Sequence, residues 1–239
     1  MSGEKLELAV HTLCPYSQRA LYVAAFKGLQ FDLIEVDLAN PSEWFLDLNP
    51  LCEAPALKVT RNGQVFKLTE SLNVSEYLNS FPGRSLYPIW HGKIDPLEKG
   101  IVDVFIKNQL GTAGSYLYNF FYCTEVTAEQ TQEFKNYLNT LNTMTENGNY
   151  FLHKTLGRNE MTMADAMIYP IIERYMAYKD FYQGLFEPYT GLLSWYNRMS
   201  AEPWIQTYKA PINRLQKIYH IRREPGDYRP LTLPSSLYD

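Results

Sequence analysis

The 239-residue chain is poor in cysteine and histidine and has no marked excess of either charge. Its three cysteines are too few, and odd in number, for a disulfide framework. Its four histidines are scattered without the spacing of metal ligands. The 22 basic and 26 acidic residues give a formal net charge of −4, without the basic stripe typical of nucleic-acid binding. We therefore expect no metal site and no nucleic-acid partner.

Long apolar runs are also missing. The segment ALYVAAF falls far short of the roughly 20 residues that cross a bilayer. The amino terminus, MSGEKLEL, lacks the apolar core of a signal peptide. Since 46% of the residues are hydrophobic and 20% are charged, the composition fits a soluble globular protein. Free thiols persist in a reducing compartment, so we expect a cytoplasmic protein with no membrane span.

The first third of the chain alternates between short strand and helix patterns. KLELAVHT and FDLIEVDL read as half-buried strands, with a helix from Pro15 to about Lys27 between them. PSEWFLDLNP then predicts a short helix, and APALKVTRNGQVFKLT predicts a hairpin that turns at Asn62-Gly63. ESLNVSEYLNSF predicts a closing amphipathic helix. The order βαβαββα indicates a thioredoxin-like α/β domain over residues 1–84.

After residues 81–93, FPGRSLYPIWHGK, strand patterns give way to helical ones. We expect a linker at 85–94, an all-helical domain at 95–220 and an irregular carboxyl-terminal extension at 221–239. Helical patterns cover about 95–123, 127–147, 162–179, 189–200 and 203–219. In the third of these, Thr162 and Asp165 form a capping-box pattern. A core-facing stripe follows it: Met167, Ile168, Ile171, Ile172 and Tyr175.

Cys14 stands at the mouth of the first predicted helix, directly before Pro15. The first backbone N–H groups of a helix have no partner within it, and together with the helix dipole they stabilise a thiolate. Proline suits the first helical position because its missing N–H would have been unpaired. A cysteine that only packs at a strand–helix joint is the competing interpretation.

The segment CEAPAL, residues 52–57, places Pro55 at the start of a predicted strand. Only about 5% of X–Pro bonds are cis, so a trans proline at a strand edge is one interpretation. The position relative to Cys14 favours the cis form found in thioredoxin-like folds. Ala54 would then offer its N–H and C=O to an extended peptide.

The segment TESLNVSEYL offers a place for an amino-acid head group. Ser71 can present its hydroxyl and the amides of the helix start to a carboxylate, and Glu70 can pair with an ammonium group. The alternative is ordinary helix capping by Thr69 or Ser71, which needs no ligand.

These segments, with SEWFLDLNP and TMADAMIYPIIERY, resemble the glutathione transferase family, above all its cysteine-bearing omega class and next the lambda class and dehydroascorbate reductases. The resemblance implies a thioredoxin-like domain followed by a helical domain, a homodimer, and glutathione as cosubstrate. It further implies that Cys14 forms a mixed disulfide with glutathione. Tyr16, Ala54 and Pro55 would then flank the tripeptide. Glu70 and Ser71 would hold its γ-glutamyl end.

Two positions depart from the omega pattern. Pro41 stands where a lysine is usual in the omega class. In the segment before Pro55, a glycine followed by an apolar residue is common, but here the pair is Cys52-Glu53. The Glu53 carboxylate would disfavour a nearby thiolate by repulsion. Cys52 could pack beneath the loop, pair with Cys14 or take up glutathione itself.

The expected reaction is thiol–disulfide exchange on a small electrophilic or disulfide substrate. Tyr16 and Ser17 leave glutathione conjugation open as another activity. We expect the second substrate between the domains, where SYLYNFFYC supplies aromatic side chains, and we select Tyr116 and Phe120 as its pocket. Core packing is the commoner explanation of such an aromatic run. The rival hypothesis is a non-catalytic ligand-binding or assembly protein of the same fold.

Overall fold

A computed structural model describes residues 3–123 and 125–219, and the chain divides into two compact units. The first unit holds the described residues up to Arg84 together with Thr207–Ala210. The second holds Ser85–Gln206 and residues 211–219. Residue 220 and the extension expected at 221–239 lie outside the described residues.

The first unit follows the expected βαβαββα order. Its elements are β1 (Glu4–Val10), α1 (Pro15–Lys27), β2 (Asp32–Glu35), α2 (Glu43–Leu48), β3 (Ala56–Arg61), β4 (Gln64–Leu68) and α3 (Ser71–Asn79). The sheet order is β2-β1-β3-β4, with β1 parallel to β2 and antiparallel to β3, and β3 antiparallel to β4. The thioredoxin-like fold class is therefore confirmed, although β2 is shorter than the pattern FDLIEVDL predicts.

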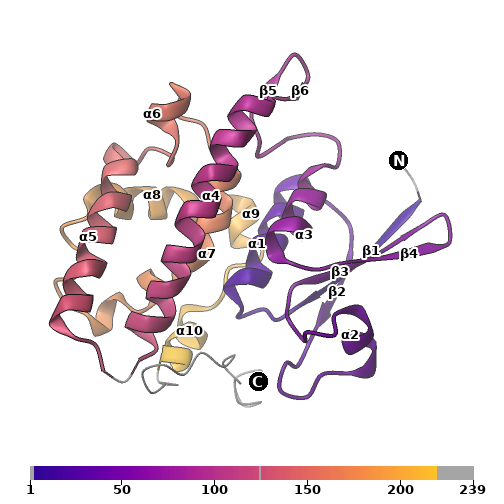
Figure 1. The fold of residues 1–239 in the computed structure, drawn as a ribbon, viewed down its shortest axis with the longest axis horizontal. Helices are drawn as coiled ribbons and strands as arrows, with labels where there is room; N and C mark the ends of the chain where they lie inside the picture. Colours follow the sequence, from indigo (N-terminus) through magenta and orange to yellow (C-terminus); the bar gives the residue numbers. More distant parts are fainter. Residues whose placement is uncertain (1–2, 124, 220–239) are drawn as a thin grey trace. The chain divides into compact units, whose positions relative to one another are not determined.

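Helices cover both faces of this sheet (Figure 1). α2 packs through Phe45 and Leu48 on the face that carries Ala9 and Ala56. Because successive strand residues point to opposite faces, Leu8, which is fully buried, lies on the other face, where α1 and α3 pack together. The sheet is thus a fixed platform from which the loops after β1 and before β3 extend.

Local signals place the turns of this unit where the sequence predicts them. Asn62 and Gly63 both have positive φ, 51° and 79°, as a primed two-residue hairpin turn requires. Gly28, with φ of 64°, ends α1 and donates its N–H to the carbonyl of Ala25.

The second unit is helical. Its main elements are α4 (Pro96–Tyr116), the π-helix η1 (Leu117–Phe121), α5 (Ala128–Met144), α6 (His153–Leu156), α7 (Met163–Ala177), α8 (Thr190–Ser200), α9 (Pro203–Gln206) and α10 (Ile212–Tyr219). The single helix expected at 203–219 is wrong. Pro211 cannot donate a backbone hydrogen bond and disfavours helical geometry at Ala210, so α9 and α10 are separate.

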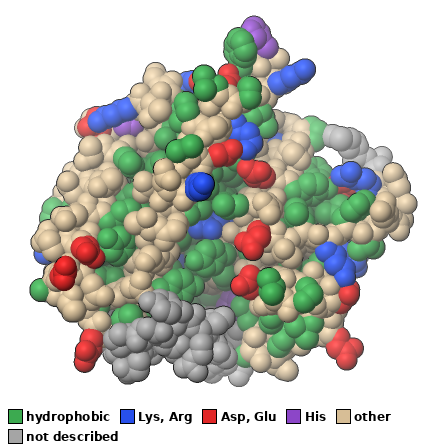
Figure 2. All heavy atoms as spheres, viewed as in Figure 1, with side chains coloured by type: hydrophobic (Ala, Val, Ile, Leu, Met, Phe, Trp, Pro, Cys, Tyr) green, Lys and Arg blue, Asp and Glu red, His purple; other side chains and the backbone are tan. Residues whose placement is uncertain are grey.

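A small hairpin, β5 (Ile89–Trp90) with β6 (Lys93–Ile94), precedes α4. Figure 2 shows hydrophobic, histidine and lysine side chains gathered at its tip, where Trp90 is 63% exposed. In the part of the chain that is described, we find no helix long and apolar enough to cross a membrane.

α7 is the central helix of the second unit. The predicted capping box at its start is confirmed: Thr162 Oγ1 accepts from Ala164 N at 3.3 Å, and Asp165 Oδ2 accepts from Thr162 N at 3.0 Å. Asp165 also accepts from Trp195 Nε1 at 2.9 Å. The predicted core-facing stripe is confirmed, since all five of its residues are fully buried. The remaining residues of α7 are buried as well, so the helix is surrounded on all sides.

Candidate functional site

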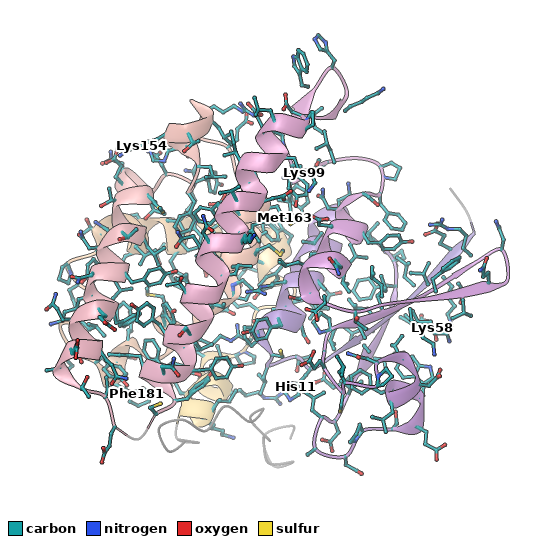
Figure 3. All side chains as sticks on the ribbon, viewed as in Figure 1. His11, Lys58, Lys99, Lys154, Met163 and Phe181 are labelled. Atoms are coloured by element: carbon teal, nitrogen blue, oxygen red, sulfur yellow. The ribbon has the colours of Figure 1, made fainter. Side chains whose placement is uncertain are left out.

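The turn between β1 and α1 fixes the position of Cys14. The buried His11, labelled in Figure 3, accepts at its carbonyl from Cys14 N at 2.8 Å and donates its own N–H to Ser17 Oγ at 3.1 Å. Its Nδ1 accepts from Leu13 N at 3.2 Å. One buried residue therefore ties the loop to the first turn of the helix that follows.

Cys14 is the residue that caps α1, with φ of −80°, ψ of 124° and Pro15 as the first helical residue. Its thiol is half-buried, and among the described residues no side chain caps this helix start. The helix dipole therefore favours a negative charge at this position.

The loop before β3 lies beside the sulfur. The Ala54–Pro55 peptide bond is cis, as its position relative to Cys14 predicts. Cys14 Sγ lies 3.8 Å from the Ala54 carbonyl oxygen, although the two residues are 40 positions apart. Ala54 is half-buried and Pro55 is buried. The fold therefore brings the predicted nucleophile and the predicted peptide-pairing residue into contact.

Glu70 and Ser71 stand at the start of α3. Glu70 is exposed, with φ of 69° and ψ of 120°, a conformation that costs free energy in a residue other than glycine. Within the described chain no side chain caps α3, so the capping alternative for Thr69 and Ser71 is wrong. The buried Ser71 Oγ instead accepts from Arg19 Nη1 at 3.1 Å.

Arg19 is a site residue that the sequence analysis missed. It is 3% exposed, and its guanidinium carbon lies 4.7 Å from the ring centroid of the half-buried Tyr16. The same guanidinium reaches Ser71, so Arg19 links Tyr16 to Ser71. An arginine one turn inside an otherwise apolar helix pattern was the available signal.

Glu35, at the end of β2, holds the loop on its other side. Its Oε1 accepts from Thr12 N at 2.9 Å and from Thr12 Oγ1 at 3.2 Å. The partners are 23 positions apart, which explains why no local pattern indicates the contact.

All three cysteines are free. Cys52 is half-buried, packs against the cluster beneath α2, and points its Sγ at the Leu38 carbonyl, 3.9 Å away. Burial raises the pKa of the Cys52 thiol. These contacts match the packing alternative for Cys52, and the neighbouring Glu53 is exposed.

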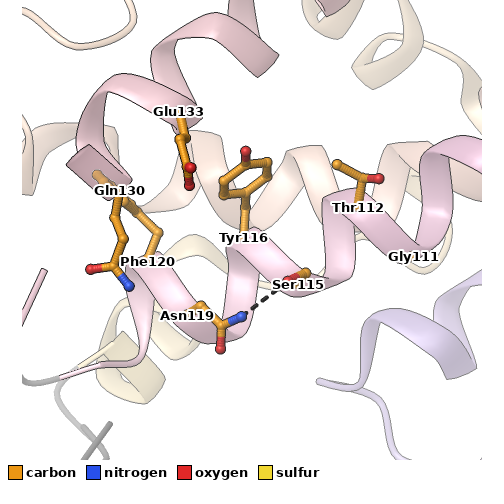
Figure 4. A pocket seen from close by; sticks show the side chains of 8 residues that line it. All are labelled: Gly111, Thr112, Ser115, Tyr116, Asn119, Phe120, Gln130 and Glu133. Atoms are coloured by element: carbon orange, nitrogen blue, oxygen red, sulfur yellow. Dashed lines mark hydrogen bonds between the residues drawn. The ribbon is translucent and has the colours of Figure 1, made fainter. Parts of the chain in front are cut away.

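Tyr116 and Phe120, selected from the sequence for a second-substrate pocket, lie together in the helical unit. They line a pocket of about 410 Å³ (Figure 4). Its other lining residues are Gly111, Thr112, Ser115, Asn119, Gln130 and Glu133. In the described residues we find no group of three or more His, Cys, Asp or Glu side chains arranged to hold a metal ion.

One chain thus combines a thioredoxin-like unit, with a cysteine at the start of its first helix, and a mainly helical unit. The family model described as "Glutathione S-transferase, N-terminal domain" matches residues 13–80, and that described as "Glutathione S-transferase, C-terminal domain" matches residues 114–211. The chain belongs to the glutathione S-transferase family.

Among curated relatives, the chain is 40% identical over 76 residues to glutathione S-transferase omega-1 of Mus musculus, covering 31% of this chain and 30% of that protein. It is 38% identical over 95 residues to pyrimidodiazepine synthase of Drosophila melanogaster, covering 39% and 37%. The chain thus spans about a third of the length of these relatives. The human omega-2 enzyme is 28% identical over 172 residues, covering 69% of this chain and 65% of that protein.

Solved structures agree on the fold. Glutathione transferase Omega 1C from Trametes versicolor superposes with a TM-score of 0.70 at 18% identity, covering 90% of this chain and 95% of that one. Omega 2S of the same organism, solved in complex with 2,4-dihydroxybenzophenone, gives 0.71 at 19% identity, covering 91% and 98%.

Proposed function

We propose that this protein is a glutathione-dependent thiol transferase of omega type, with Cys14 as nucleophile. The observation that carries the proposal is the position of the Cys14 sulfur at an uncapped helix start, 3.8 Å from the Ala54 carbonyl. The omega-class relatives support glutathione as cosubstrate.

The reaction is two successive thiol–disulfide exchanges. The Cys14 thiolate attacks the glutathionyl sulfur of a mixed disulfide, forming a Cys14–glutathione disulfide and releasing the other thiol as a thiolate, which takes up a proton. A second glutathione thiolate then attacks the bound glutathionyl sulfur. Glutathione disulfide leaves, and the Cys14 thiolate is restored.

The surrounding residues have binding roles in this scheme. The Ala54 N–H and C=O pair with the backbone of the tripeptide beside Pro55. Ser71 and the amides of the α3 start receive the γ-glutamyl carboxylate, and the exposed Glu70 carboxylate receives its ammonium group. Tyr16, in the first turn of α1, packs beside the tripeptide in this scheme. We further propose a homodimer, a cytoplasmic location, and Tyr116 and Phe120 as contacts of the acceptor.

Turnover of a glutathione mixed disulfide, and of dehydroascorbate as a second acceptor, tests the proposal. We expect Cys14→Ala to reduce both activities to the uncatalysed background and the matched Cys52→Ala variant to retain them. Activity that survives in Cys14→Ala contradicts the cysteine mechanism.

The second candidate is a non-catalytic glutathione-binding protein, favoured by Pro41 and Glu53 at positions where the omega pattern differs. Retention on immobilised glutathione separates the two functions. Retention without turnover of either acceptor supports the binder, whereas retention with Cys14-dependent turnover supports the enzyme.

A further inference from the structure

The pocket of the helical unit has a rigid aromatic floor. Tyr116 stacks on Tyr137, with centroids 5.1 Å apart and planes 27° from parallel, and its ring lies 5.1 Å from that of Phe134. Phe120 is 3% exposed and its ring centroid lies 4.5 Å from that of Phe134. Because Phe134 and Tyr137 are themselves buried, the two floor rings are held from behind, and a ligand would not have to order them.

The floor is built where α4 changes to a π-helix. Phe120 lies within Leu117–Phe121, and Tyr116 immediately precedes that segment. π-helical turns are rare and occur frequently at functional sites. The pocket volume of about 410 Å³ also lies within the range of small-molecule sites, about 300–1,000 Å³.

The rim of the pocket is polar and negative. Figure 4 shows the Glu133 carboxylate, from α5, pointing toward the Tyr116 ring, and Asn119 and Gln130 standing near Phe120. Of the described residues that line the pocket, Glu133 is the one with a formal charge. Burial raises the pKa of the Tyr116 hydroxyl, and the Glu133 carboxylate raises it further, so the phenol stays neutral at neutral pH.

We propose that this pocket binds a planar aromatic cation, such as a protonated aromatic amine or a quaternised N-heterocycle. Its ring would lie on Tyr116 and Phe120, and its positive charge would face Glu133. An aromatic face attracts a cation through its quadrupole, and a carboxylate adds direct attraction. As an acceptor site this inference rests on the proposed function, but as a binding site it needs no catalysis.

Two ligands of nearly the same shape distinguish the contribution of the positive charge from that of the buried ring area. They are N-methylquinolinium and the neutral 1-methylnaphthalene. Their affinities for the full chain are measured by calorimetry, without turnover and also in Cys14→Ala, so that loss of the thiol chemistry leaves this result unaffected. We expect saturable binding of N-methylquinolinium and weaker binding of the neutral ring.

The substitutions then locate the site. Glu133→Gln should weaken N-methylquinolinium binding about threefold to fivefold at low salt and leave 1-methylnaphthalene unchanged. Glu129→Gln, the same change one turn earlier on α5 and outside the pocket lining, is the control and should change neither affinity. Tyr116→Leu should weaken cation binding about tenfold, in a variant whose melting temperature shows that it is folded.

Three results would overturn the proposal. They are equal affinity for the two ligands, equal losses in Glu133→Gln and Glu129→Gln, and no saturable binding of N-methylquinolinium.

Discussion

Arg19 donates a hydrogen bond from Nη1 to the hydroxyl of Ser71, 3.1 Å away, across 52 residues of sequence. The bond joins the second turn of α1 to the first residue of α3. Because the guanidinium supplies the proton, the Ser71 hydroxyl can direct its own hydrogen at a bound carboxylate. The buried positive charge of Arg19, next to Ser71, also attracts a carboxylate bound at the start of α3.

Replacing this arginine should affect binding more than chemistry. We expect Arg19→Gln to raise the KM for glutathione about tenfold with kcat within about twofold. It should also lower the free energy of unfolding by about 1–3 kcal/mol, since a buried contact is lost. Steady-state kinetics and urea unfolding measure the two effects.

Arg61→Gln is the matched control. Arg61 is exposed and pairs with Glu4, Nε to Oε1 at 2.5 Å, at the far end of the hairpin strand. A solvent-exposed pair of this kind contributes little to stability, so both the free energy of unfolding and KM should stay near the wild-type values. An unchanged KM in Arg19→Gln would contradict the positioning role of Arg19.

Glu70→Gly should separate stability from function. A glycine accepts φ of 69° without steric cost, so the free energy of unfolding should stay the same or rise by up to about 1 kcal/mol. Retention on immobilised glutathione should fall, because the carboxylate that receives the ammonium group is gone.

Asn62→Gly is the control: it also places a glycine at a positive φ, 51°, but in the exposed hairpin turn. We expect it to leave glutathione retention unchanged. If the two variants show the same retention, Glu70 has no role in binding.

Much of the fold follows from short-range pattern. Strand alternation, Asn62-Gly63 and the stop at Gly28 are local signals, and they predict their elements, although β2 is shorter than its alternating pattern. The break between α9 and α10 has a local signal too, Pro211, which the helical periodicity around it outweighs in a sequence-based prediction.

Some residues of the candidate site can likewise be predicted from local sequence, whereas others depend on packing. Cys14 and Ala54 can be predicted from the sequence because each directly precedes a proline, Pro15 or Pro55. The Arg19–Ser71 and Thr12–Glu35 bonds depend on how α1, α3 and β2 pack, and no periodicity within one segment encodes such a pairing. Phe121, in the π-helix Leu117–Phe121, likewise packs against rings from other helices, Phe134 of α5 and Tyr175 of α7.

Cys52 should react slowly with alkylating agents at neutral pH. The thiolate is the reactive form, and burial raises the pKa of this group above its usual 9.0, so alkylation should remain slow at neutral pH. In Cys14→Ala we expect its rate with iodoacetamide to rise about tenfold per pH unit from about pH 7 and to show no plateau below about pH 9. Peptide mass spectrometry resolves Cys52 from Cys123. A plateau below about pH 9 would contradict this assignment.

Asp165 should be the most sensitive carboxylate of the helical unit. It is fully buried and accepts from Thr162 N, Phe151 N and Trp195 Nε1. Asp165→Ala leaves those donors without an acceptor, and we expect a loss of about 3–5 kcal/mol in the free energy of unfolding. Thr127→Ala, in the exposed capping box of α5, should cost only about 1 kcal/mol. Equal losses in urea unfolding would contradict the dominant role of burial.

The most direct test of the central claim is mass spectrometry of the protein after incubation with glutathione disulfide at neutral pH. We predict one glutathione adduct, located on the Cys14 peptide and released by fresh glutathione, in wild type and in Cys52→Ala but not in Cys14→Ala. An adduct located on Cys52 or Cys123 instead, or a Cys14 that stays unmodified, would contradict it.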